Sequence, residues 1–170
     1  MSLVLAMLPL LFAVATVLPL APEARAEISG PVVGVNPACG TLTDNVFGFN
    51  DDSGVPSDFT YTNGSHWCVR VDWYIPPPPK EASCAVNFYV PIGKATALLP
   101  VGLIDSAGRK TVVTIDESGA YGDTVVIGKP AGVDNPITHV NIGDNNGQQP
   151  GSAQIGWGNF PESVFWACGH

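Results

Sequence analysis

The stretch Cys68-Val-Arg-Val-Asp-Trp-Tyr-Ile75 decides the fold class of this 170-residue chain. Apolar and polar side chains alternate along it, which is the period of a β-strand that packs one face on a core and leaves the other face open. The apolar face is expected to carry Val69, Val71, Trp73 and Ile75, and the polar face Arg70, Asp72 and Tyr74. We therefore predict a half-buried β-strand here.

The same alternation recurs downstream, beginning with Cys84-Ala-Val-Asn-Phe-Tyr-Val90. Four apolar residues of this stretch share one face, and Asn87 is expected on the opposite face. Further β-rich runs are expected at 97–105, 110–116, 124–128, 137–142, 153–157 and 163–168. Turn sequences such as Asp105-Ser-Ala-Gly108 separate these runs.

The spacing of the predicted strands is typical of an antiparallel β-sandwich with a jelly-roll-like arrangement. After residue 26, no segment of helical length keeps an apolar period of 3.6 residues. The chain also contains 19 Gly and 16 Pro, which disfavour long helices. We predict one all-β domain over residues 47–170, preceded by an N-terminal extension over residues 27–46 and stapled by two disulfides.

Residues 1–26 have the composition of a secretory signal peptide. The run from Leu3 to Leu20 carries no charge, and Ala24-Arg25-Ala26 places small residues at the two positions that signal peptidase recognises. The alternative is a membrane-spanning helix, because the run approaches the minimum length for one, but Pro9 and Pro19 disfavour that helix. We predict cleavage after Ala26, no membrane span in the mature chain, and a secreted, extracellular protein.

Cys39, Cys68, Cys84 and Cys168 all follow the predicted cleavage site. An even number of cysteines in an exported chain indicates disulfides, and the zinc-binding spacings C-x-x-C and H-x-x-x-H do not occur. Cys84 and Cys168 are both in phase with the expected buried face of their strands, so they can meet across a sheet or a sandwich. This phase favours the pairs Cys84–Cys168 and Cys39–Cys68 among the three pairings that four cysteines allow.

The chain is acidic, with 7 Lys and Arg against 15 Asp and Glu and a net charge of −8. Nucleic acids are bound mainly through clusters of Lys and Arg, and the sequence contains no such cluster. We therefore expect no nucleic-acid partner. The expected partner is an extracellular glycan or another cell-surface component.

The motifs from Cys84 onward follow a familiar order. Cys-x-Val-x-Phe-Tyr-Val-Pro (84–91) is followed by a Ser-x-Gly turn (106–108), by Thr-Val-Val-Thr-Ile-Asp-Glu (111–117) and by Val-Val-Ile-Gly (125–128), before Glu162-Ser-Val-Phe-Trp-Ala-Cys168. Over residues 47–168, this order resembles the golvesin / xanthan-lyase C-terminal-type domain. The resemblance implies a β-sandwich of the kind appended to secreted bacterial hydrolases, with a role in binding carbohydrate.

Candidate catalytic residues are sparse. The histidines are His66, His139 and His170, and the chain contains neither a Gly-x-Ser-x-Gly nor a His-Glu-x-x-His motif. Asp116 and Glu117 are adjacent at the end of a predicted strand, where neighbours point to opposite faces, so they make a poor acid/base pair. We predict no catalytic residue, and the sequence favours a protein that is not an enzyme.

Two oxygen-rich loops have a metal-binding and a structural interpretation. Asn50-Asp51-Asp52-Ser53-Gly54 and Asp144-Asn145-Asn146-Gly147 offer carboxylate and amide oxygens, which are the ligands that Ca²⁺ prefers. Neither loop matches the EF-hand pattern, and Asp and Asn are equally favoured in plain Asx turns. The sequence requires no cofactor; if calcium binds, the candidate ligands are Asp51, Asp52 and Asp144.

Sugars pack their C–H faces on exposed aromatic rings, so aromatic residues are the candidate ligand contacts. Those off the predicted core faces are Tyr61, Tyr74, Tyr89 and Tyr121. Trp157 stands between Gly156 and Gly158, and such small neighbours would leave both faces of its ring open to a ligand. The alternative is that Trp157 fills the core with the other three tryptophans, because aromatic residues dominate core burial.

Three classes of function compete. The favoured one is a secreted, non-catalytic binding module for carbohydrate or another component of the envelope or extracellular space. The first alternative is an envelope-associated structural or protein-interaction domain, which a large exposed apolar patch would favour. The second alternative is a small secreted hydrolase without a recognised motif, which a buried polar cleft holding a histidine beside a carboxylate would favour.

Overall fold

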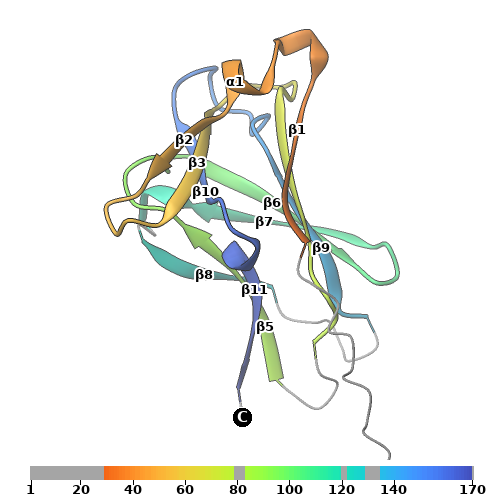
Figure 1. The fold of residues 1–170 in the computed structure, drawn as a ribbon. Helices are drawn as coiled ribbons and strands as arrows, with labels where there is room; N and C mark the ends of the chain where they lie inside the picture. Colours follow the sequence, from red (N-terminus) through yellow and green to blue (C-terminus); the bar gives the residue numbers. More distant parts are fainter. Residues whose placement is uncertain (1–28, 79–82, 120–121, 129–134, 170) are drawn as a thin grey trace, which may run out of the picture.

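A computed structural model of the chain describes residues 29–78, 83–119, 122–128 and 135–169. These ranges contain eleven strands and four short helical turns (Figure 1). The strands are β1 (Ser29–Val35), β2 (Phe47–Asn50), β3 (Pro56–Tyr61), β4 (Val69–Tyr74), β5 (Ser83–Val90), β6 (Leu98–Asp105), β7 (Lys110–Asp116), β8 (Asp123–Gly128), β9 (Ile137–Gly143), β10 (Gln154–Gly158) and β11 (Val164–Gly169). The helical turns are η1 (Pro37–Cys39), α1 (Leu42–Asn45), η2 (Glu117–Gly119) and η3 (Pro161–Ser163).

The strands form three antiparallel sheets, ordered β1-β4-β9-β6-β7, β10-β3-β2 and β11-β5-β8. The five-stranded sheet packs against the other two in one core. The rings of Trp73 in β4 and Phe88 in β5 meet edge to face, with centroids 5.6 Å apart. Most connections pass from one layer to the other, and the hairpins β2–β3 and β6–β7 are the ones within a sheet. The predicted all-β, antiparallel sandwich is therefore confirmed.

The core lies between the layers, as the period-two pattern predicts. Buried side chains come from both layers and include Val69, Val71, Trp73 and Ile75 of the opening stretch, together with Val86, Phe88, Val90, Leu99, Val101, Ile155 and Trp157. Asn87 is an exception, because it was expected on an open face and is only 6% exposed. Its strand, β5, is the middle one of its sheet, and its amide donates to the Ala85 carbonyl at 3.0 Å.

The segment expected to be an N-terminal extension contributes to the sandwich. Its strand β1 pairs along the edge of the five-stranded sheet, with Val33 opposite Val71 of β4. Gly30 and Pro31 interrupt the apolar run of β1, and such residues are depleted in strands, which is why the sequence pattern did not indicate this strand. The sandwich thus includes residues from Ser29 onward. The predicted signal peptide, residues 1–26, lies outside the described residues.

Both predicted disulfides are present. Cys84 and Cys168 lie directly opposite each other on β5 and β11, so this bridge joins two neighbouring strands. Cys39 and Cys68 join η1 to the residue that precedes β4. Disulfides of this kind are typical of proteins that fold in an oxidising compartment. Across the part of the chain that the structure describes, each helix is too short to cross a bilayer.

Candidate ligand-binding site

Two loops pair at one end of the sandwich, and we call them the paired loops: residues 62–68 between β3 and β4, and residues 144–153 between β9 and β10. Four backbone hydrogen bonds join them, including Asn63 N–H to the Asp144 carbonyl at 2.8 Å and Gly151 N–H to the Thr62 carbonyl at 2.7 Å. The Cys68 N–H also donates to Asp144 Oδ1 at 2.8 Å. The Cys39–Cys68 bridge and these bonds fix the backbone on which two hollows are built.

The first hollow, which we call the aromatic hollow, has a volume of about 240 Å³. The rings of Phe47 and Tyr61 line it, 36% and 44% exposed, and their centroids are 5.9 Å apart. Asp44 of α1 and Asp144 add carboxylates. The Thr41 side chain and backbone N–H hold the pKa of Asp44 below its ordinary value, whereas burial raises the pKa of Asp144, an effect that hydrogen bonds from Cys68 and Val69 partly offset. The aromatic hollow therefore combines two rings with acidic oxygens.

The second hollow, which we call the basic hollow, is also lined by residues of the paired loops and has a volume of about 190 Å³. Its lining comes from the outer face of the five-stranded sheet and from the paired loops: Trp67, Arg70, Lys110, Asn141, Ile142, Gly143 and Asn145. Trp67 is 42% exposed. This hollow therefore combines an open indole ring with two cations and two amides.

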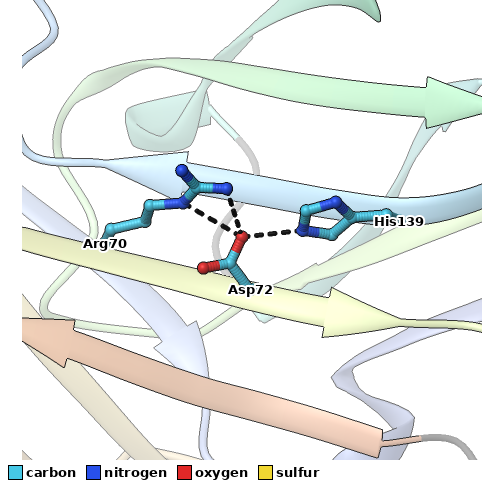
Figure 2. A network of polar contacts seen from close by, with 3 residues as sticks. All are labelled: Arg70, Asp72 and His139. Atoms are coloured by element: carbon cyan, nitrogen blue, oxygen red, sulfur yellow. Dashed lines mark hydrogen bonds and ion pairs between the residues drawn. The ribbon is translucent and has the colours of Figure 1, made fainter. Parts of the chain in front are cut away.

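A polar network continues from the basic hollow along the sheet, and Figure 2 shows it. Asp72 Oδ1 accepts hydrogen bonds from Arg70 Nε at 3.0 Å and Nη2 at 2.8 Å, and its contact with His139 Nε2 is 2.7 Å. The Tyr74 ring stacks on His139, with centroids 4.5 Å apart and an interplanar angle of 13°. The network fixes the direction of the Arg70 guanidinium.

A histidine beside a carboxylate invites comparison with a hydrolase. In a catalytic triad, the second ring nitrogen of the histidine faces a nucleophile. Within the described residues, the polar contact of the His139 ring is with Asp72, and the same carboxylate oxygen also holds Arg70. The side chains lie on a sheet face rather than in a buried cleft. In this geometry, Asp72 orients the Arg70 guanidinium and contacts the His139 ring through the same oxygen.

Trp157 is the main correction to the predicted ligand contacts, because its side chain is fully buried (0% exposed). The flanking glycines do not open the ring to solvent. A Cβ at Gly156 would lie 2.7 Å from the Lys94 carbonyl, and one at Gly158 would lie 2.4 Å from the Phe160 ring. The glycines therefore admit neighbouring loops that cover the strand, and Trp157 belongs to the core.

The tyrosines predicted as ligand contacts differ in exposure and position. Tyr61 and Tyr74 are exposed, and Tyr61 lines the aromatic hollow, whereas Tyr74 lies beyond both hollows. Tyr89 is half-buried, and its hydroxyl donates to Asp51 Oδ2. Burial, that hydrogen bond and the Asp51 charge raise the pKa of Tyr89 to about 12. Tyr121 lies outside the described residues.

The candidate calcium ligands do not converge. Asp51 Oδ1 accepts the Ser53 and Val55 N–H groups, both at 2.9 Å, which is an Asx turn. Burial raises the pKa of Asp51, but hydrogen bonds from Tyr89 and three backbone N–H groups outweigh that effect and lower it. Among the described residues, the group of three side chains close enough to share a metal is Cys39, His66 and Cys68, in which both thiols form a disulfide. Asp51, Asp52 and Asp144 thus do not form one cluster.

Sequence reasoning did not identify the exposure of Trp67, which it considered only under the alternative that all four tryptophans fill the core. By parity, Trp67 is in phase with Val69 and Trp73, the buried face of β4. The alternation does not extend to residue 67, because β4 begins at Val69 and the preceding residues form a loop. Lys110 and Asn141 were also missed, since nothing in the sequence places their strands beside each other.

Glu117 is a buried acid whose importance the sequence did not indicate. It lies in η2, is 0% exposed, and faces away from the exposed Asp116, as expected for neighbours at a strand end. Its Oε1 accepts the Gly156 N–H at 3.3 Å, and its Oε2 has no hydrogen-bond partner among the described residues. Burial raises the pKa of Glu117 well above its ordinary value, and backbone hydrogen bonds offset only part of this.

Replacing Glu117 by Gln is expected to stabilise the fold increasingly as pH rises. An acid with a raised folded-state pKa folds best in its neutral form. Below the unfolded-state pKa of about 4.3 both states are neutral and there is no ionisation penalty; the wild type then loses stability as pH rises toward the folded-state pKa. Urea unfolding from pH 4 to 9 would measure this. The exposed Glu162→Gln is the control, and a difference between wild type and Glu117→Gln that does not grow with pH would contradict the prediction.

Comparisons of the chain with protein-family models, with curated proteins and with solved structures found no match. The site is therefore interpreted from its own geometry.

Proposed function

We propose that this chain is a secreted, non-catalytic module that binds an extracellular glycan or another envelope component through the two hollows. The observation that carries the proposal is the exposed Trp67 ring beside the amides of Asn141 and Asn145 in one concave site. Ligand sites are typically concave and combine apolar or aromatic surface with a few orienting polar groups. An indole face accepts sugar C–H groups, and amides match hydroxyls as both donors and acceptors.

The position of the hollows supports an extended ligand. In one loop, Asp144 lines the aromatic hollow and its neighbour Asn145 lines the basic hollow. In the other loop, Asn63 lines the aromatic hollow and Trp67 lines the basic hollow. Both hollows thus flank the same paired loops. An oligosaccharide chain that crosses these loops would contact Tyr61 on one side and Trp67 on the other. The two disulfides and the resemblance to a carbohydrate-binding sandwich domain are consistent with an extracellular role.

The envelope-associated protein-interaction domain is the second candidate. Phe47, Phe59 and Tyr61 form an aromatic cluster with centroid distances of 5.3–5.9 Å, and Phe47 and Tyr61 are exposed. Leu42 of α1 adds a further exposed apolar side chain. Aromatic residues are enriched in protein interfaces. This surface would favour a protein partner if the basic hollow proved dispensable.

Trp67→Ala is expected to weaken glycan binding by about tenfold, which corresponds to about 1.4 kcal/mol. The first step is a glycan array on the mature protein, followed by calorimetry on the best glycan. Tyr74→Ala is the matched control, because Tyr74 is also an exposed ring, 49% exposed, but lines neither hollow. The proposal fails if no glycan binds, or if Tyr74→Ala weakens binding and Trp67→Ala does not.

A further inference from the structure

We propose that the basic hollow binds the carboxylate of an acidic saccharide, a sugar chain with uronic-acid residues; this inference rests on the proposed function. The chain has seven Lys and Arg and a net charge of −8, yet two of these cations, Arg70 and Lys110, line the same hollow. No Asp or Glu of the described residues lines it. A local cationic site on an acidic protein points to an anionic ligand group.

The Arg70 guanidinium is pre-oriented to bind a ligand carboxylate. Its Nε and Nη2 both donate to Asp72 Oδ1, at 3.0 and 2.8 Å. A guanidinium carries five N–H groups, so three remain for a ligand, and the Arg70 side chain is 49% exposed. Because the Asp72 contact already fixes the side chain, binding loses less conformational entropy. Asp72 neutralises part of the Arg70 charge, which makes Lys110 the main uncompensated cation: within the described ranges, Lys110 forms no ion pair.

Two glycines leave room for the side chains that form the basic hollow. A Cβ at Gly102 would lie 2.4 Å from Asn141 Oδ1 and 3.1 Å from Lys110 Cε, and one at Gly143 would lie 2.8 Å from Asn145 Oδ1. The missing side chains let Asn141, Lys110 and Asn145 lie across the backbone of β6 and β9. The side-chain amides of Asn141 and Asn145 line the hollow and offer both donors and acceptors to hydroxyl groups.

The negative net charge of the protein favours an anionic ligand whose charges are widely spaced. DNA carries one negative charge per about 1.7 Å of its axis, and a protein of net charge −8 repels such a polymer beyond the contact site. A polyuronate has one charge per sugar ring, so its charges are more widely spaced. At physiological salt, charges more than about 8 Å apart are largely screened, which weakens the repulsion from distant acids more than the contact with Lys110. The exposed Trp67 ring forms a wall for the sugar itself.

The test compares an acidic sugar chain with its neutral methyl ester, which differ in the charge and in one methyl group at each carboxyl. Calorimetry on the mature protein would use an oligogalacturonate and its methyl ester, with oligoglutamate as a non-sugar polyanion. The acid is expected to bind about tenfold more tightly than the ester, and Lys110→Met should remove that preference while changing ester affinity by less than about twofold. The control is Arg109→Gln, because Arg109 adjoins Lys110 but pairs with Asp105 outside the hollow and should leave the preference unchanged. Thermal unfolding verifies that each variant is folded.

Each outcome separates this inference from the proposed function. Equal binding of acid and ester overturns the acidic class. An acid preference that survives Lys110→Met overturns the assignment of the carboxylate contact to Lys110 in the basic hollow. Either result leaves glycan binding intact. Oligoglutamate that binds as tightly as the oligogalacturonate overturns the assignment to a saccharide. If no neutral or acidic glycan binds at all, the proposed function itself fails. A Gly102→Ala variant gives an independent measurement: its Cβ would displace Asn141 and should weaken both sugar ligands together.

Discussion

Replacing Cys84 and Cys168 by Ser is expected to lower the free energy of unfolding by about 4–5 kcal/mol. The bridge joins residues 84 positions apart, so it removes much of the conformational entropy of the unfolded chain. Domains of this size are stable by only about 5–15 kcal/mol, so the loss approaches the whole margin at the lower end of that range. Urea unfolding of wild type and Cys84→Ser/Cys168→Ser would measure it.

The second bridge is the internal comparison for this prediction. Cys39 and Cys68 are 29 positions apart, and the same chain-entropy model gives about 3.6 kcal/mol for a loop of that length. The double variant Cys39→Ser/Cys68→Ser should therefore be the more stable of the two by about 1 kcal/mol. The opposite order would show that loop closure does not decide the contribution of these bridges. Loss of the second bridge should also loosen the paired loops and weaken ligand binding in the folded protein.

The alternation of side chains predicted the sandwich where one face of a strand is buried and the other is open. In β4, the buried Val71 and Trp73 and the more open Arg70 and Tyr74 follow the pattern directly. The same pattern identified the Cys84–Cys168 pair, because both cysteines are in phase with buried neighbours and the strands that carry them are adjacent. Local periodicity is sufficient for such features because each depends on which face of its own strand meets the core.

The pattern failed where other parts of the chain decide the environment. β3 carries buried polar residues, among them Asp58 and Thr60, so its sequence does not alternate in hydrophobicity. Burial raises the pKa of Asp58, and a hydrogen bond from Asn159 offsets part of that effect. Asn159 lies far away in the sequence, and its N–H also donates to the Pro56 carbonyl at 2.9 Å. Contacts of this kind have no local signature.

The candidate site was the least predictable part for the same reason. The basic hollow requires Lys110 of β7, Asn141 of β9 and Arg70 of β4 to lie near one another, although they are distant in sequence. Their proximity follows from the strand order β4-β9-β6-β7, and from the absence of a side chain at Gly102 of β6. Residue types alone predicted that exposed aromatic rings contact the ligand, and for Trp157 this prediction is wrong because its ring is buried.

Trp157→Ala is expected to destabilise the fold by about 3–5 kcal/mol, the usual cost of removing a buried tryptophan side chain. Trp157 is fully buried among apolar residues of both layers, so truncation leaves a cavity that the neighbours fill only in part. Its indole nitrogen has no hydrogen-bond partner among the described residues, so Trp157→Phe loses ring volume alone. Thermal and urea unfolding would measure both variants.

Trp73 provides the matched comparison, because it is equally buried but its Nε1 donates to Ser163 Oγ at 3.0 Å. Trp73→Phe removes that bond and leaves a buried hydroxyl unpaired, so it should cost about 1–2 kcal/mol more than Trp157→Phe. Folded Trp157→Phe should also keep the glycan affinity of the wild type, because the ring lines neither hollow. A Trp157→Phe variant that stays folded but loses glycan binding would contradict this prediction and indicate that Trp157 contacts the ligand. The buried Trp157 ring stabilises the fold, whereas the exposed Trp67 ring is available to a ligand.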